Sequence, residues 1–354
     1  MNTMKTLNRN RLRAVGCGGF GRRLLLAACI AVLGACSAWT EPEGVGVTTP
    51  DAGRDDPQLY AEYLAALRAY RQSAHKIVYV EFANDREEPA SRAHHPASLP
   101  DSVDVVCLSH PETMPGWMAR EVAAMRRDKG IRTVYAVDYE AIEADYQALA
   151  PDEEFARFAE RRIDALFALC DAYGYDGVTL RYLGRSTLTM TDAERAEFAS
   201  RQQALLDKAA AWRAAHPEKL FFFEGRPEYL LARDLLREAD YLIMATRDAT
   251  DVMQLTLRTL TSLRAHVPAD RVLVAVSTAS LDPSDTKTGY FSSADGTPLP
   301  ALREAAYWVA TDDAAFVKAG LVVGAVAADY HDASLSYAHV REAVSIMNPT
   351  PKYE

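Results

Sequence analysis

The feature that most constrains the fold is a regular alternation of short β-branched or aromatic runs with longer amphipathic segments. Eight runs are predicted to be strands: Lys76–Ala83, Val103–Ser109, Arg132–Asp138, Gly177–Tyr182, Lys219–Glu224, Tyr241–Thr246, Arg271–Ser277 and Leu321–Ala327. Strands that alternate with helices form parallel sheets of the α/β class. Because eight strands match a closed barrel, whereas an open doubly wound sheet needs no particular number, we predict a (β/α)8 TIM barrel.

The segments between these strands have helical spacing of their apolar residues. The predicted helices include Gly116–Lys129, Asp152–Tyr173, Asp192–Ala215, Asp251–Ala265 and Ala301–Lys318, and residues 57–73 form another helix before the barrel. Thr191 and Glu194 are spaced as a capping box, and Gly130 and Gly320 are expected to end helices. The long polar connections 84–102 and 280–300 follow strands, so we expect them at the carboxyl end of the barrel, where sites are built.

The first 35 residues are predicted to be a lipoprotein signal peptide. Arg22 and Arg23 precede an apolar run, Leu24–Leu33, that is too short to span a bilayer but typical of a signal peptide. Gly34, Ala35 and Cys36 follow and resemble a lipobox, which makes Cys36 the expected lipidation site; the alternative is a plain secretory signal with a chance cysteine. This predicts an exported protein anchored in the bacterial outer membrane, facing the periplasm or the exterior.

Residues 36–56 are rich in Pro, Gly, Thr and acidic residues and are predicted to be a flexible tether, followed by a barrel domain over residues 57–354. Because residues 1–35 hold six basic and no acidic residues, their removal changes the formal net charge from −10 to −16. An acidic body argues against nucleic acid as a partner. Cys107 and Cys170 are expected to be buried free thiols, and no Cys/His pair has metal-ligand spacing, so no metal or cofactor is expected.

The fourth predicted strand begins within the sequence Asp176-Gly177. The sequence around it resembles a motif of glycoside hydrolase family 18. That family's hallmark is Asp-Gly-x-Asp-x-Asp-x-Glu, in which the last Glu protonates the glycosidic oxygen and the preceding Asp holds the substrate's acetamido group. Here Thr179, Arg181 and Leu183 stand at the three acidic positions after the glycine. A leucine cannot donate a proton, so the resemblance implies a degenerate catalytic motif.

Two further segments resemble the same family. The sixth strand often carries Met-x-Tyr-Asp in the family, and here only Met244 remains of that motif, with Arg247 in place of the aspartate. The first strand (Val78–Ala83) and the tail (Arg341–Pro349) look like those of family-18-like lipoproteins from Bacteroidota glycan-utilisation systems. Some members of that group cleave N-glycans and others only bind glycans. The resemblance implies a glycan ligand and an outer-membrane glycan importer as a partner, and we expect a monomer.

The residues expected to face a common cavity at the strand ends supply aromatic faces and fixed polar groups for a sugar. The predicted glycan-binding residues are Phe82, Asn84, Asp138, Tyr139, Arg181, Tyr182, Glu224, Arg226, Arg247, Tyr330 and Asp332. For Arg181 the alternative is a structural ion pair with Glu224 or Asp138, and for Phe82 and Tyr182 it is core packing. Glu224 is the candidate for a relocated acid, although Arg226 beside it would lower its pKa.

Three hypotheses follow in order of preference. The first is a lipoprotein that binds N-acetylglucosamine-containing glycans, of the N-glycan or chitooligosaccharide type, without hydrolysis. The second is an active endo-beta-N-acetylglucosaminidase with a relocated acid such as Glu224 or Asp332. The third is a structural envelope protein with no ligand, which an Arg181 side chain filling the mouth would favour.

Overall fold

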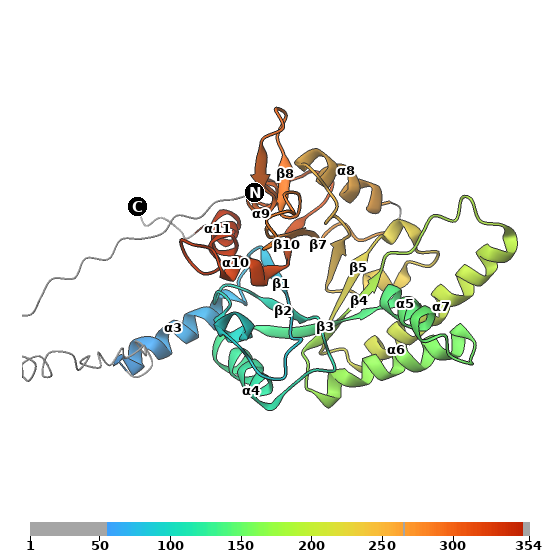
Figure 1. Cartoon of the computed structure of the whole chain (residues 1–354), viewed down its shortest axis with the longest axis horizontal. Coiled ribbons are helices and arrows are strands. Elements are labelled where there is room, and N and C mark those ends of the chain that lie inside the picture. The colour runs from blue at the N-terminus through green and yellow to red at the C-terminus, as the bar shows by residue number, and fades with distance from the viewer. Residues whose placement is uncertain (1–54, 265, 350–354) are drawn as a thin grey trace, which may run out of the picture. The chain divides into compact units, whose positions relative to one another are not determined.

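Eight parallel strands close into a barrel in the computed structural model, which describes residues 55–264 and 266–349 (Figure 1). The strands are β1 (Ile77–Phe82), β2 (Val105–Leu108), β3 (Arg132–Asp138), β4 (Gly177–Tyr182), β5 (Leu220–Gly225), β6 (Tyr241–Met244), β7 (Val272–Ser277) and β10 (Lys318–Gly324). They pair in the order β1-β10-β7-β6-β5-β4-β3-β2, and β2 closes on β1. The predicted (β/α)8 TIM barrel is confirmed.

Helices surround the barrel in Figure 1. They are α3 (Pro57–Tyr70), α4 (Gly116–Ala124), α5 (Tyr139–Leu149), α6 (Phe155–Ala172), α7 (Asp192–Ala215), α8 (Val252–Ser262), α9 (Ala301–Ala310), α10 (Val326–Tyr330) and α11 (Ala338–Met347). The capping box predicted from Thr191 and Glu194 begins α7. Gly130, with a φ of 74°, ends the π-helical turn that continues α4, because a left-handed residue at that position suits glycine.

The apolar side chains form two layers, one inside the barrel and one between the barrel and its helices. The inner layer is built around Tyr79, Phe222, Ile243 and other inward residues, and Phe221 and Phe223 belong to the outer layer. Neighbouring residues of a strand point to opposite faces, which explains why three consecutive phenylalanines are all fully buried. The strand predicted over Lys219–Glu224 is therefore present and buried on both faces.

The last barrel strand differs from its prediction. The helix expected over Ala301–Lys318 ends at Ala310, and β10 begins at Lys318, so Gly320 lies in a strand and does not end a helix. The ammonium group of Lys318 donates to the carbonyl oxygens of Trp308 (3.0 Å) and Thr311 (2.9 Å), at and beyond the end of α9. At position 320 a Cβ would lie 2.0 Å from the carbonyl oxygen of Ile77, so the close approach of β10 to β1 requires glycine.

The two long connections contain short regular elements that the sequence pattern did not indicate. Residues 84–102 include the 3₁₀ helices Arg92–His94 and Pro96–Ser98. Residues 280–300 include the antiparallel hairpin of β8 (Tyr290–Ser292) and β9 (Pro298–Pro300), which extends from the barrel beside α8 in Figure 1. Both connections follow barrel strands, β1 and β7, and so belong to the carboxyl end of the barrel.

Asp176 of the Asp-Gly pair lies at the opposite end of the barrel, just before β4. Its carboxylate accepts hydrogen bonds from the guanidinium of Arg126 (2.9 Å) and the backbone N–H of Thr133 (2.8 Å), and it also pairs with Arg132. Gly177 follows at a close approach of β4 to β5, since a Cβ there would lie 2.0 Å from the carbonyl oxygen of Leu220. The retained half of the motif therefore has a structural role.

Two sequence predictions concern the ends of the chain and its cysteines. The predicted signal peptide, Cys36 and nearly all of the tether lie outside the described residues. Within residues 55–264 and 266–349 no helix is long and apolar enough to cross a membrane. Cys107 and Cys170 are free and buried, as predicted.

Candidate functional site

Five charged side chains meet at the carboxyl end of the barrel and form the group that we call the mouth network. Its members are Glu81 from β1, Asp138 from β3, Arg181 from β4, Glu224 from β5 and Arg247, which follows β6. The strand register places Asp138 beside Arg181 and Arg181 beside Glu224 on three adjacent strands. Glu81, Arg181 and Glu224 each follow an inward-facing residue by two positions, and alternate residues of a strand point the same way, so these side chains enter the barrel.

Arg181 lies at the centre of the mouth network. Its guanidinium forms ion pairs with the carboxylates of Glu224 (2.8 Å), Glu81 (2.6 Å) and Asp138 (3.2 Å). The predicted structural ion pairs of Arg181 with Glu224 and Asp138 are therefore both present. Three carboxylates around one guanidinium need a further cation, and Arg247 supplies it.

Arg247 closes the other side of the mouth network. It pairs with Glu81 (2.7 Å) and, at very short range, with Glu224. Glu224 is thus held between two guanidinium groups and is almost completely buried, with 1% of its side chain exposed. Buried charges require such pairing, because an unpaired carboxylate in the interior has a large desolvation penalty.

The network separates the pKa values of its two most buried acids. Burial alone would raise the pKa of Glu224, but Arg247 and Arg181 outweigh burial and lower the pKa below its usual range. Burial raises the pKa of Glu81; Arg247 opposes this effect and the neighbouring Glu224 carboxylate adds to it. Glu224 is therefore ionised and suited to holding the two arginines, whereas Glu81 is the acid of the pair that takes up a proton more readily.

Arg226, which we expected to lower the pKa of Glu224, has a different partner. Its guanidinium lies 3.8 Å from the carboxylate of Asp248, in the connection after β6. The pKa of Glu224 is lowered by Arg247 and Arg181, whose guanidiniums lie beside its carboxylate at the barrel mouth. A charged neighbour two positions away in a strand-to-loop segment need not be the nearest charge in space.

Two cavities flank the mouth network and share residues with it. The larger, of about 540 Å³, is lined by Glu81, Asp138 and Arg181 together with the connections after β2 and β3, including His110 and Asp145. The other, of about 470 Å³, lies beside Arg247 under the β8–β9 hairpin and includes Tyr290 and Lys287. Both are large enough for a sugar ring and lined by polar groups.

The structure does not bring the aromatic members of the predicted site into the mouth. Phe82 and Tyr182 are each next to an inward-facing residue, so they point outward, and with Tyr139 they are buried in the layer between barrel and helices. Tyr139 and Tyr182 lie against each other, with ring centroids 5.5 Å apart. Both side chains are packed in the core, which was the alternative interpretation, and Tyr182 also lines a cavity between α5 and α7.

The remaining predicted residues lie on the connections after β1 and β10, Tyr330 at the end of α10. The side chain of Asn84 is buried and bonded to the backbone of His110 and Thr113, so it joins the connections after β1 and β2. Tyr330 lines a separate cavity beside α3, and Asp332 accepts hydrogen bonds from Ser334 in a turn after α10. None of the three belongs to the mouth network.

Leu183, at the motif's last acidic position, follows directly after β4 and has 39% of its surface exposed. Its backbone N–H donates to the Glu140 carboxylate (2.8 Å), as does that of Gly184 (2.9 Å). Sequence reasoning missed both Glu81 and Glu140. Glu81 could have been found because it is two residues after the inward-facing Tyr79 and so points to the same face of the strand. Glu140 could not be distinguished from other acidic residues near the start of a helix.

Comparisons with known proteins agree with the barrel fold. The family described as glycoside hydrolase family 18, BT1044-like, matches residues 40–346. A solved structure of BT1044, a selenomethionine form with a Glu-to-Gln substitution, has a TM-score of 0.59 and 15% identity, covering 84% of this chain and 95% of that chain. No curated protein matches the chain.

A second similar structure is an endo-beta-N-acetylglucosaminidase mutant from Cordyceps militaris in complex with fucosyl-N-acetylglucosamine-Asn. Its TM-score is 0.53 and its identity 16%, with 81% of this chain and 95% of that chain covered. At these identities the structural similarity shows the barrel fold alone. The family match spans most of the sequence, including all eight barrel strands. The chain belongs to glycoside hydrolase family 18, BT1044-like.

Proposed function

We propose that this protein binds N-acetylglucosamine-containing glycans at the barrel mouth and does not hydrolyse them. The observation that carries the proposal is the central position of Arg181, whose guanidinium pairs with Glu81, Asp138 and Glu224. A carboxyl group that serves as a general acid must hold a proton and reach the glycosidic oxygen. Ion pairs to arginine favour the ionised carboxylate and occupy its oxygens.

The position from which family 18 enzymes protonate their substrate is occupied here by Leu183. Glu224 does not replace the missing acid, because it is buried between two arginines and its pKa is lowered. The acetamido-holding aspartate of the motif corresponds to Arg181. Together these changes remove the proton donor and replace the orienting carboxylate with a guanidinium cation.

The binding part of the proposal rests on the family and on the two cavities beside the mouth network. Their volumes of about 540 and 470 Å³ suit short glycan segments, and their linings mix carboxylates, guanidiniums and hydroxyls. The Cordyceps militaris enzyme holds a fucosylated N-acetylglucosamine linked to Asn, which supports N-glycans as the first ligand class to test. Export and lipid anchoring at Cys36, with an importer as partner, remain part of the proposal on sequence grounds.

One observation favours a second candidate, a hydrolase in which Glu81 supplies the proton. Burial raises the pKa of Glu81, its side chain is 20% exposed, and it lines the larger cavity. Opposing this, its Oε1 atom accepts hydrogen bonds from both Arg181 and Arg247. If hydrolysis occurs, Glu81→Gln is the variant that abolishes it.

The binding proposal predicts that His110→Ala weakens glycan affinity. His110 is an exposed residue in the lining of the larger cavity and is outside the mouth network, so its removal leaves the ion pairs intact. Loss of one side-chain contact is expected to weaken binding by about 3–10-fold. The measurement is isothermal titration calorimetry of the full-length protein with N-glycans, chitooligosaccharides and mucin glycans.

His331→Ala is the matched control, since His331 is also exposed but lines neither mouth cavity. Equal glycan affinity of the His110→Ala variant and the unchanged protein would show that the larger cavity is not part of the binding site. Absence of binding across the whole panel would favour the structural alternative, in which the mouth network only closes the barrel.

A further inference from the structure

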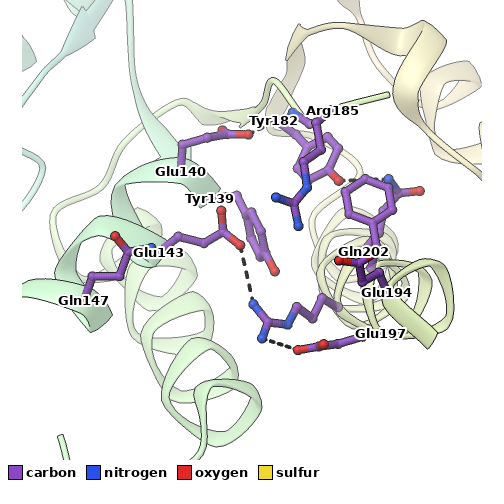
Figure 2. A pocket seen from close by; sticks show the side chains of 12 residues that line it. Tyr139, Glu140, Glu143, Gln147, Tyr182, Arg185, Glu194, Glu197 and Gln202 are labelled. Atoms are coloured by element: carbon purple, nitrogen blue, oxygen red, sulfur yellow. Dashed lines mark hydrogen bonds and ion pairs between the residues drawn. The ribbon is translucent and has the colours of Figure 1, made fainter. Parts of the chain in front are cut away.

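Another cavity lies apart from the mouth network, between α5, α7 and the connection that follows β4 (Figure 2). We call it the α5–α7 cavity; its volume is about 420 Å³, and no member of the mouth network lines it. Figure 2 shows Glu140 and Glu143 on one wall and Glu194, Glu197 and Gln202 on the other. It shares no lining residue with either of the two cavities beside the mouth network.

The first sign of a ligand is a buried hydroxyl with no partner. Tyr139 is 4% exposed, and its hydroxyl forms no hydrogen bond to any residue in the described part of the chain. Figure 2 shows this hydroxyl directed from α5 toward α7, into the cavity. Buried polar groups are nearly always paired, so an unpaired hydroxyl aimed into a cavity indicates that a bound group completes it.

The second sign is the carboxylate of Glu140. Its Oε1 atom accepts the backbone N–H groups of Leu183 (2.8 Å) and Gly184 (2.9 Å), whereas Oε2 is buried and has no partner among the described residues. Burial raises the pKa of Glu140, and the two N–H groups oppose this effect. A cation at Oε2 would supply the compensation that the carboxylate lacks.

The other charged groups of the cavity already have partners. Arg201 pairs with Glu143 (3.7 Å) and, at very short range, with Glu197. Glu194 accepts the backbone N–H of Thr191 (2.8 Å) in the cap of α7. The guanidinium of Arg185 lies over the ring of Phe198, 6.0 Å from its centroid. Four carboxylates against two guanidiniums leave the lining negative, and Glu140 is its uncompensated member.

We infer that the α5–α7 cavity binds a small ligand with a primary ammonium group, which donates to Oε2 of Glu140 while a neighbouring polar group of the ligand pairs with the Tyr139 hydroxyl. Amino sugars and aliphatic diamines both carry this chemistry, and the volume of about 420 Å³ accommodates either. An ammonium group suits the Glu140 carboxylate because it is a compact donor that forms charge-assisted hydrogen bonds.

The test compares glucosamine, N-acetylglucosamine and putrescine by calorimetry with the full-length protein. Glucosamine is expected to bind, and N-acetylglucosamine, which has the same ring but no ammonium, is expected to bind at least about 10-fold more weakly. Binding of putrescine as well would show that the ammonium suffices, whereas binding of glucosamine alone would show that sugar hydroxyls contribute; both results support the inference. Equal binding of the two sugars, or no binding of either amine, would overturn it.

Two nearly isosteric variants locate the site. Glu140→Gln is expected to weaken glucosamine binding by about 10-fold or more, because it removes the charge and keeps the shape. Tyr139→Phe is expected to weaken binding too, yet to leave the melting temperature of the ligand-free protein unchanged or higher, since it removes an unpaired buried hydroxyl. Glu218→Gln, at an exposed glutamate outside the cavity, is the control. Unchanged glucosamine affinity in both cavity variants would place the amine elsewhere and contradict the inference.

Discussion

Replacement of Glu224 with Ala is expected to lower the free energy of unfolding by about 3–5 kcal/mol, the typical effect of removing one partner from a buried ion pair. Glu224 pairs with Arg181 and Arg247 and has 1% of its side chain exposed. Its removal leaves the guanidiniums of Arg181 and Arg247 with only Glu81 and Asp138 as carboxylate partners. Chemical denaturation followed by circular dichroism measures the change.

The double variant Arg181→Met with Glu224→Leu separates pairing from burial. Because replacement of a buried ion pair by apolar side chains is often neutral, and Arg247 stays paired with Glu81, we expect this variant to recover part of the stability lost in Glu224→Ala. Replacement of an exposed glutamate, as in Glu218→Ala, should change the free energy of unfolding by no more than about 0.5 kcal/mol. A Glu224→Ala effect below about 1 kcal/mol would contradict the view that the mouth network is a buried, mutually compensating group.

Gly177→Ala is expected to lower the free energy of unfolding by about 3 kcal/mol or more, because the added methyl group has no space. A Cβ at position 177 would lie 2.0 Å from the carbonyl oxygen of Leu220 and 2.7 Å from its carbonyl carbon. These are backbone atoms of the neighbouring strand β5, so they cannot move aside without breaking the pairing of β4 with β5. Soluble yield and thermal melting report the effect.

Gly116→Ala is the matched control for this substitution. At position 116 the nearest atom to an added Cβ is the end of the flexible Arg120 side chain, at 3.6 Å, so we expect little change or a slight gain in stability. A Gly177→Ala protein as stable as the Gly116→Ala protein would show that β4 and β5 do not approach as closely as described. It would also remove our structural reason for the retention of this glycine.

Gly177 belongs to one half of the family motif, and Arg181, an ion-pair partner of Glu224, belongs to the other half. The Asp176–Gly177 half is retained because Asp176 binds Arg126 and the backbone of Thr133, and because Gly177 permits the contact with β5. By the sequence resemblance, the half that carries chemistry in family 18 corresponds here to Thr179, Arg181 and Leu183. Loss of the catalytic half with retention of the structural half is what we expect of a barrel that is kept for binding.

The architecture was predictable because strand and helix patterns are local. Seven of the predicted strands agree with the structure to within a few residues, since each is a short apolar run bounded by polar or turn residues. The eighth strand was displaced because the alanine-rich segment before it continued the helical pattern, and the end of α9 depends on a tertiary hydrogen bond from Lys318. The β8–β9 hairpin was missed because its strands have three residues each.

The site was only partly predictable because it depends on which strand ends meet in space. The pairing of Arg181 with Asp138 and Glu224 followed from their positions at the ends of adjacent strands. Glu81 and the role of Arg247 did not follow, because they reach the centre across the barrel from β1 and from the connection after β6. The aromatic residues Phe82 and Tyr182 were assigned to the mouth because strand ends alone do not fix which face a side chain takes.

The most direct test of the central claim is product analysis of the full-length protein with N-glycans and chitooligosaccharides that it binds by calorimetry. Mass spectrometry after prolonged incubation is expected to show the bound glycans intact, because Arg181 and Leu183 stand where the orienting and proton-donating acids would be. Release of a product with N-acetylglucosamine at its reducing end would contradict the claim, and loss of that release in Glu81→Gln would identify the acid responsible.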